Sequence, residues 1–175
     1  ETLDRLAHYD PLTGAPNRRL LEDRMAQALA RTQRSGKRLA LCYLDLDNFK
    51  PINDQLGHAA GDRFLIEIAQ RLQQGLRAED TLARLGGDEF VLLLADLERD
   101  TDWQTVLQRA MDRLSQPVQI EGRSVSSSAS VGVALYCADA DAPPDPQTLL
   151  RQADQAMYQA KQEGRNRYRL FELKA

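Results

Sequence analysis

The chain has 175 residues, of which 42% are hydrophobic and 28% charged, values typical of one globular domain with a substantial core. Its formal net charge of −3 provides no overall basic field, so a nucleic-acid polymer is disfavoured as a partner. No apolar run reaches the about 18 residues of a membrane span, no signal peptide is evident, and the two cysteines lack metal-ligand spacing, so we expect a cytoplasmic domain without membrane contact.

Apolar periodicity and turn residues divide the chain into alternating helices and strands. After the end of an incoming helix over residues 1–9 and a turn over residues 10–14, we expect helices over residues 18–34, 49–56, 62–74, 102–115 and 147–162. We expect strands over residues 39–44, 81–85, 89–95, 118–120, 125–136 and 168–171, and an acidic, proline-rich loop over residues 138–146. This alternation predicts one mixed sheet with helices on its faces.

The central pair of strands carries the most distinctive residues of the chain. Gly86 and Gly87 separate them, and two adjacent glycines favour a tight hairpin turn, whose central positions need positive φ. Asp88 and Glu89 follow at once, so two carboxylates stand where the turn becomes a buried strand. Acids after a turn are usually only solvated, so the remaining motifs decide whether these two are functional.

A second polar stretch follows the buried strand over residues 39–44. Asp45 ends that strand, the backbone amides of Asn48 and Phe49 begin the next helix, and Lys50 comes next. Helix-start amides and a lysine suit a phosphate, and carboxylates suit Mg²⁺, which usually shares its oxygen ligands with substrate phosphates. If Asp45 and Asp88 lie on neighbouring strands, their charges repel by about 1–4 kcal/mol at roughly 4 Å, and a divalent cation removes that repulsion.

Five motifs follow one another along the chain. They are Asp10-Pro11-Leu12-Thr13-Gly14 with Asn17-Arg18, then residues 45–54, residues 57–62, Gly86-Gly87-Asp88-Glu89-Phe90, and Lys161 with Gly164-Arg165-Asn166-Arg167. Together they resemble the GGDEF family of diguanylate cyclases, whose fold is similar to the adenylyl cyclase core and the polymerase palm. The resemblance implies an α/β (α+β) domain over residues 10–175, after the end of a signalling helix over residues 1–9. Its core would be a central, mixed, mostly antiparallel five-stranded sheet flanked by helices, with a hairpin carrying the GGDEF motif.

The resemblance also implies a bacterial second-messenger enzyme. Such an enzyme condenses two GTP molecules into cyclic di-GMP with release of pyrophosphate, uses Mg²⁺ or Mn²⁺, works as a homodimer and is inhibited by its product. An upstream sensor domain is expected in a longer chain. The closing residues 168–171 also resemble relatives that continue into a phosphodiesterase domain.

Roles follow from the resemblance residue by residue. The metal would be held by Asp45, the backbone carbonyl of Leu46, Asp88 and Glu89, and the catalytic residues would be Asp45, Lys50, Asp88 and Glu89. The substrate would be bound by Asn48, Phe49, Lys50, Asn53, Asp62, Gly86, Gly87, Lys161 and Arg165. Asn53 and Asp62 would read guanine, because a carboxylate accepts from the N1–H and N2–H₂ donors that adenine lacks on that edge.

A second site is implied before the hairpin, at Arg77-Ala78-Glu79-Asp80. Arg77 and Asp80 have the spacing of the family's inhibitory RxxD motif, which binds cyclic di-GMP. Arg84 is an additional ligand by position, and Arg109 is a weaker candidate. The alternative interpretation of this stretch is a charged surface loop.

Other interpretations stay open at this point. Asp47 is as readily a helix cap as a ligand, His58 is interpreted as structural, and Lys161 with Arg165 would otherwise be a solvated helix end. The alternative function is a non-catalytic regulatory module that binds GTP or cyclic di-GMP. A polymerase-like nucleotidyltransferase that acts on nucleic acid is disfavoured by the missing basic face.

Overall fold

The structure is a computed structural model that describes residues 2–138 and 142–172. Its helices are α1 (Thr2–His8), α2 (Arg18–Ser35), α3 (Phe49–Leu56), α4 (His58–Gln74), α5 (Asp102–Leu114) and α6 (Pro146–Gln162). Its strands are β1 (Arg38–Leu46), β2 (Thr81–Gly86), β3 (Glu89–Leu97), β4 (Val118–Ile120), β5 (Arg123–Val125), β6 (Ala129–Cys137) and β7 (Arg167–Leu170). Position 1 of the expected incoming helix, positions 139–141 of the expected loop and positions 173–175 at the expected domain end lie outside the described residues.

Five strands form the central sheet, in the order β2–β3–β1–β6–β7. β1 pairs antiparallel with both β3 and β6, β2 pairs antiparallel with β3, and β7 runs parallel to β6. The helix α6 makes the crossover between the two parallel strands, as such a connection requires. The expected mixed, mostly antiparallel five-stranded sheet with flanking helices is confirmed.

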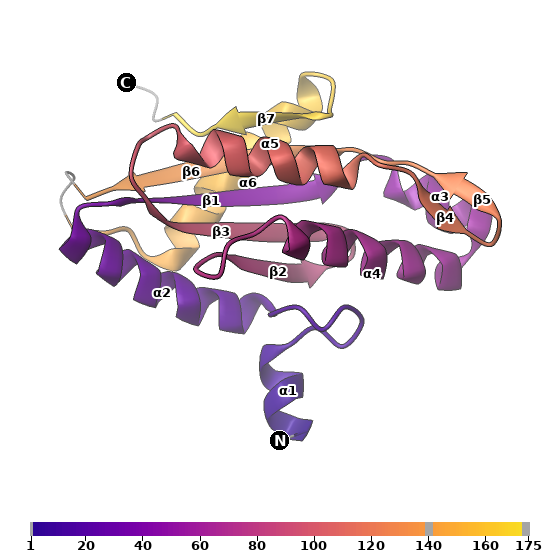
Figure 1. Cartoon of the computed structure of the whole chain (residues 1–175), viewed down its shortest axis with the longest axis horizontal. Helices are drawn as coiled ribbons and strands as arrows, with labels where there is room; N and C mark the ends of the chain where they lie inside the picture. The colour runs from indigo at the N-terminus through magenta and orange to yellow at the C-terminus, as the bar shows by residue number, and fades with distance from the viewer. Residues whose placement is uncertain (1, 139–141, 173–175) are drawn as a thin grey trace.

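Successive side chains of β1 enter two different cores, because strand residues alternate between the faces of a sheet. Ala40, Cys42 and Leu44 pack with residues of α4 and α5 on one face. Leu41 and Tyr43 pack with residues of α2 and α6 on the other face. Figure 1 shows α4 and α5 in front of the sheet and α6 behind it. A strand that is covered on both faces explains the unbroken apolar run of this segment.

Gly132 in β6 allows α6 to lie directly on the sheet. A Cβ atom at this position would lie 1.9 Å from the carbonyl oxygen of Ala153 and 2.2 Å from the amide nitrogen of Met157. Both atoms belong to the helix backbone, so they cannot move aside without the helix. The absence of a side chain at Gly132 therefore fixes the height of α6 above β6.

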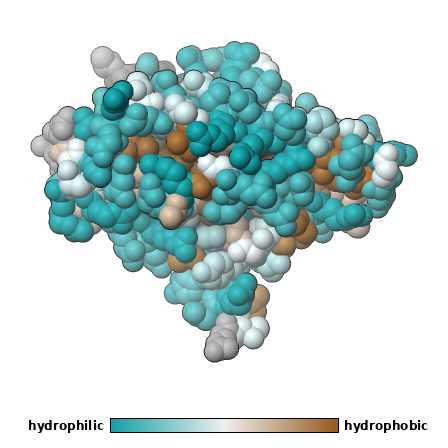
Figure 2. Space-filling view, in the orientation of Figure 1, coloured by the Kyte–Doolittle hydropathy of each residue, from teal (hydrophilic) through white to brown (hydrophobic). Residues whose placement is uncertain are grey.

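Helix α1 projects from the rest of the molecule (Figure 1). Its residues Leu3 and Leu6 are 82% and 61% exposed, whereas hydrophilic residues cover most of the face shown in Figure 2. The expectation of a helix before the turn is confirmed for residues 2–8. Within the described part of the chain, no helix has the length and apolar character needed to cross a membrane.

The expected strand over residues 125–136 is confirmed for residues 129–136, which lie in β6, and is wrong at its start, because Val125 ends β5 in a second sheet and residues 126–128 are not in a strand. β4 and β5 form a separate hairpin whose turn residues Glu121 and Gly122 have φ of 52° and 77°. β6 begins only at Ala129, after a run of serines that leaves the strand conformation. The signal that was overlooked is the Glu-Gly pair, because a two-residue turn with positive φ at both positions closes a hairpin.

Two local boundaries also differ from expectation. α4 begins at His58 rather than at residue 62, so Gly61 lies inside the helix. The hairpin turn is shifted by one residue, because Gly86 still pairs with Glu89 and the turn consists of Gly87 and Asp88. Both glycines have positive φ as expected, 139° and 49°.

Candidate active site

A polar cleft of about 400 Å³ lies at the carboxyl end of β1. It is lined by Asp45, Leu46, Asp47, Asn48, Phe49, Lys50, Pro51, Asp88, Lys161 and Arg165. These residues come from the end of β1, the start of α3, the β2–β3 turn and the end of α6 with the turn that follows it. Three stretches that are distant in sequence, residues 45–51, Asp88 and residues 161–165, thus bring most of the predicted metal and phosphate residues together.

Two carboxylates face each other in this cleft. The amide of Leu46 donates to the carbonyl of Asp88 over 3.1 Å, which ties the hairpin turn to the end of β1. Burial, then the charge of Asp45 and a side-chain hydrogen bond with it, raises the pKa of Asp88 from 3.8 to about 6. Burial makes the largest contribution to this rise, and the neighbouring charge of Asp45 adds to it, so the charged form of Asp88 is disfavoured in the cleft.

Cationic side chains reach the same carboxylates from α6. Lys161 Nζ donates to Asp45 Oδ2 over 2.5 Å, and its charge partly opposes the rise in the pKa of Asp88. Arg165 lies in the turn after α6 with φ of 64° and also lines the cleft. The alternative of a solvated helix end does not hold for Lys161, because its ammonium group makes this ion pair.

The start of α3 forms another wall of the cleft. Asn48 precedes this helix in the left-handed conformation, with φ of 58°, and no side chain caps the first turn. Uncapped N-terminal amides attract an anion, because they carry the positive end of the helix dipole. Lys50 is exposed beside them. These groups adjoin two carboxylates, and their role in binding phosphate stays a prediction.

Asp47 has a structural role that the sequence did not reveal. It is 3% exposed, and its carboxylate accepts from the hydroxyls of Ser128 and Ser130, both over 2.6 Å, and from the amide of Asn166 over 3.0 Å. These bonds join the end of β1 to the start of β6 and to the loop before β7. Asp47 is therefore neither a helix cap nor a free metal ligand in this structure.

Glu89 lies directly across from Asp45 in the β1–β3 register. Its Oε2 accepts from the hydroxyl of Tyr43 over 3.3 Å. Burial raises the pKa of Glu89, and this hydrogen bond opposes the rise. Glu89 is not among the residues that line the polar cleft, so its contribution there stays a prediction.

The predicted guanine-reading residues lie at the corner between α3 and α4, and neither lines the polar cleft. Asn53 Oδ1 is buried without a hydrogen-bond partner among the described residues. A Cβ atom at Gly61 would lie 1.7 Å from this oxygen, so glycine is needed for the close approach of the two helices. Asp62 follows Gly61 and is exposed. Asp62 is open to a ligand, whereas Asn53 Oδ1 is enclosed beside Gly61, so the guanine-reading role of this pair stays a prediction.

Arg77 and Asp80 of the predicted inhibitory motif form an ion pair with each other. Asp80 has a fully buried side chain and accepts from Arg77 Nε and Nη2 over 2.9 and 2.8 Å. The amides of Arg77 and Ala95 also donate to it. A hollow of about 430 Å³ that includes Asp80 is lined from α2 by Arg24 and Arg31, which the sequence analysis did not identify. Their seven-residue spacing on one helix was the available signal.

Arg84 and Arg109 do not join this pair. Arg84 Nη1 contacts Asp10 Oδ1 at 2.8 Å, and its Nε and Nη2 donate to the carbonyl of Gly87 over 3.0 and 2.7 Å. Arg109 lines a separate groove beside Tyr168. A role for Arg84 in product binding remains a prediction and would require its present bonds to break.

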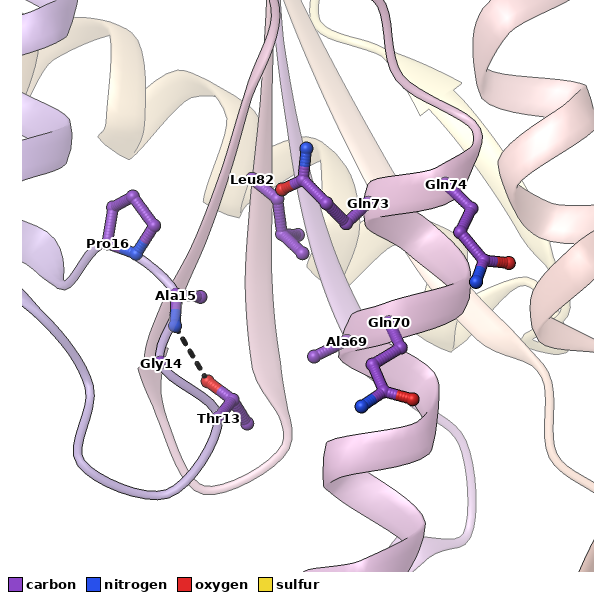
Figure 3. Close-up of a pocket in the computed structure, with 9 residues that line it drawn as sticks. All are labelled: Thr13, Gly14, Ala15, Pro16, Ala69, Gln70, Gln73, Gln74 and Leu82. Carbon is purple, nitrogen blue, oxygen red and sulfur yellow. Dashed lines mark hydrogen bonds between the residues drawn. The ribbon is translucent and has the colours of Figure 1, made fainter.

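A further hollow, of about 350 Å³, separates the loop after α1 from α4 (Figure 3). It is lined by Thr13, Gly14, Ala15, Pro16, Ala69, Gln70, Gln73, Gln74 and Leu82. None of these lining residues carries a charge, and the dashed bond in Figure 3 joins Ala15 N to Thr13 Oγ1. This hollow has no group for acid–base or phosphate chemistry, so the polar cleft is the candidate active site.

Comparison with known proteins gives a consistent result. Residues 7–167 match the family model described as "Diguanylate cyclase, GGDEF domain". The chain is 48% identical to the bifunctional diguanylate cyclase/cyclic di-GMP phosphodiesterase MucR of Pseudomonas aeruginosa over 97% of this chain and 24% of MucR.

Solved structures of GGDEF domains have the same fold as this chain. The GGDEF domain of TpbB (YfiN) from Pseudomonas aeruginosa superposes with a TM-score of 0.88 and 42% identity, over 95% of both chains. The coiled coil and GGDEF domain of DgcB from Caulobacter crescentus, in complex with cyclic di-GMP, superposes with a TM-score of 0.84 and 26% identity, over 97% of this chain and 88% of that one. The chain spans less than two-fifths of the length of the curated relatives it matches.

Proposed function

The chain belongs to the GGDEF family of diguanylate cyclases, and from this premise we propose that it condenses two molecules of GTP into cyclic di-GMP with release of pyrophosphate. The observation that carries the proposal is the polar cleft, in which Asp45 and Asp88 meet Lys161 and the uncapped start of α3. Carboxylates beside cations and helix-start amides suit a nucleotide triphosphate with its metal.

The donor set fits Mg²⁺, with Mn²⁺ as a substitute. Among residues 2–138 and 142–172 no cluster of three or more His, Cys, Asp or Glu side chains could hold a metal alone. Asp45, Asp88 and the carbonyl of Leu46 would therefore hold the ion together with substrate phosphates, and Glu89 would be a further acidic ligand. The closeness of the two carboxylates supports this fit: burial and the charge of Asp45 both disfavour the charged form of Asp88, and a divalent cation between them would favour it. When bound, the metal would polarise the phosphate and favour ionisation of the attacking hydroxyl.

The remaining cleft residues would hold the triphosphate. Lys50, Lys161 and Arg165 would neutralise its charge, and the amides of Asn48 and Phe49 would donate to its oxygens. The turn glycines Gly86 and Gly87 would allow a substrate to approach the backbone closely, since neither carries a Cβ and the space beside both positions is open.

Guanine would be read at the corner between α3 and α4. Asp62 would accept from N1–H and N2–H₂, and the unpaired Oδ1 of Asn53 would accept a further donor. Adenine would leave these oxygens without donors, which is a strong basis for rejection.

In the reaction, the 3′-oxygen of one GTP forms a bond to the α-phosphorus of the other. The bond between the α-phosphorus and the oxygen that bridges it to the β-phosphate breaks, pyrophosphate leaves, and the hydroxyl proton passes to an acidic side chain, for which Glu89 is the candidate. Two such steps close the ring. We propose that two copies face each other, each binding one GTP in its cleft, and the projecting α1 with exposed Leu3 and Leu6 supports pairing through this end.

We also propose product inhibition at Arg77 and Asp80, the pair beside the hollow lined by Arg24 and Arg31. Arginine side chains in this hollow suit the acceptors of guanine and phosphate. Calorimetric titration of cyclic di-GMP into the protein tests the site. Arg77→Ala is expected to lose the binding, and an unchanged affinity would remove the site.

The deciding experiment is incubation with GTP and Mg²⁺, followed by chromatography for cyclic di-GMP. We expect product from the wild type and none from Asp88→Ala. If even a forced dimer binds GTP or cyclic di-GMP but makes no product, the chain is the alternative, a regulatory binding module. We further propose that the domain works in the cytoplasm within a longer protein with a sensor domain, and with a phosphodiesterase domain where the chain continues.

A further inference from the structure

Three chemically active side chains lie on one face of the sheet. Tyr43 and Asp45 are two residues apart in β1, so both point to the face that α2 and α6 cover. Glu89 lies opposite Asp45 in β3 and shares that face. We propose that Tyr43 is a positioning residue, whose hydroxyl holds the Glu89 carboxylate beside the acidic pair in the orientation that the reaction needs. This inference rests on the proposed function.

The position of the Tyr43 ring is fixed by its surroundings. The residue is 4% exposed and packs in the core between α2 and α6. A ring buried in this way has lost its rotamer freedom during folding, so its hydroxyl presents a preorganised donor. The contact to Glu89 Oε2, at 3.3 Å, engages one carboxylate oxygen and leaves Oε1 for the metal or the attacking hydroxyl.

The surrounding charges show why Glu89 needs such a restraint. Arg18 at the start of α2 attracts its charge, and Asp154 on α6 repels it. Both residues line a hollow of about 200 Å³ beside Tyr43, together with Gln147, Leu150 and Arg151. Without the Tyr43 hydroxyl, the side chain of Glu89 would have room to turn towards Arg18 and away from Asp45. The attraction of Arg18 and the repulsion of Asp45 would both favour that movement.

The hydroxyl acts as a donor at neutral pH. Burial, followed by the charges of Glu89 and Asp154, raises the pKa of Tyr43 to about 12. A protonated phenol donates one hydrogen bond to a carboxylate, and at 3.3 Å this one is longer than a typical bond of its kind, so we assign it an orienting role.

Loss of the Tyr43 hydroxyl should lower turnover and leave the affinity for GTP nearly unchanged. Tyr43 contacts Glu89 and does not line the polar cleft, so its loss would misplace an acidic group without removing a contact to GTP. We therefore expect Tyr43→Phe to lower kcat about five- to twentyfold and to change KM for GTP less than about twofold. In a Glu89→Gln background the same change should have little further effect, because its partner has already been altered.

Tyr136→Phe is the matched control. Tyr136 is also 4% exposed and packs in the same core, but it pairs with Leu39 at the other end of β1. Its hydroxyl has no hydrogen-bond partner within the described parts of the chain. The control therefore removes an equally buried hydroxyl without touching Glu89, and we expect its kcat and KM to match the wild type.

Crystal structures of wild type and Tyr43→Phe supply a readout that does not depend on activity. The inference expects an ordered Glu89 within hydrogen-bond reach of Tyr43 in the wild type and a displaced or disordered Glu89 in the variant. An unmoved Glu89, or a kcat for Tyr43→Phe equal to that of Tyr136→Phe, overturns it. A wild type that makes no cyclic dinucleotide refutes the proposed function instead, and the crystallographic comparison still decides the positioning role.

Discussion

Replacing Asp88 with asparagine should stabilise the metal-free protein while abolishing its chemistry. The carboxylate of Asp88 is half-buried against Asp45, and its pKa is raised from 3.8 to about 6. This increase in the pKa of Asp88 corresponds to about 3 kcal/mol of unfavourable free energy for the charged carboxylate in the folded protein. Solvent screening of a half-exposed group reduces this to about 1–2 kcal/mol.

The sign follows from the direction of the shift. Because the folded state binds this proton more tightly than the unfolded state, the contribution of Asp88 to stability falls as pH rises from about 4 to about 6. Asp88→Asn does not titrate, so its advantage should be absent below pH 4 and complete above pH 6. At pH 7.5 we expect Tm to rise by about 2–8 °C for a chain of this size.

The assay is thermal or urea unfolding in EDTA at several pH values, with Asp23→Asn, an exposed acid on α2, as the control. Adding Mg²⁺ and GTP should reverse the order, because only the wild type keeps its carboxylate ligand. The reasoning is refuted if Asp88→Asn gives no stabilisation at pH 7.5, or if its advantage grows as the pH falls towards 4.

Three further changes test other parts of the site. Gly61→Ala would place a Cβ 1.7 Å from Asn53 Oδ1, so calorimetry should show GTP affinity reduced by about tenfold or more. Asp47→Asn replaces a buried acceptor of two serine hydroxyls and should lower the unfolding free energy in urea by about 2–3 kcal/mol; a change below about 0.5 kcal/mol would contradict its role. A parallel dimeric coiled coil fused before α1 should raise turnover about tenfold or more at low protein concentration, and equal turnover would argue against pairing through this end.

Much of this architecture could be predicted from local sequence. The buried strand β1 follows from its unbroken apolar run, and α2 and α6 follow from their periodicity and their caps at Asn17 and Asp145. The meeting of Asp45 with Asp88 was also accessible, because both follow from strand-end positions on neighbouring strands. The helices and β1 depend on residues that are close in sequence, and the meeting of Asp45 with Asp88 depends only on β1 and β3 being neighbours in the sheet.

Other parts depend on register, which local patterns do not set. The serines that hold Asp47 are Ser128, just before β6, and Ser130 in β6, more than 80 positions later. The bond from Ser130 depends on the register that pairs Ser130 with Asp45. The Tyr43–Glu89 bond likewise needs the β1–β3 register. The buried state of Asp80 was missed because a motif match shows residue identity and spacing but not whether the partner guanidinium already occupies the carboxylate.

The glycine beneath α6 has a practical consequence for mutational surveys. Any side chain at Gly132 would push α6 away from the sheet. The C-terminal end of α6 holds Lys161, which contacts Asp45 in the cleft, so this contact would also be disturbed. A screen scored by enzymatic output alone would therefore count this remote, chemically inert position among the reactive groups. Measuring the stability of each inactive variant would distinguish a substitution that disturbs the fold from one that removes a catalytic group.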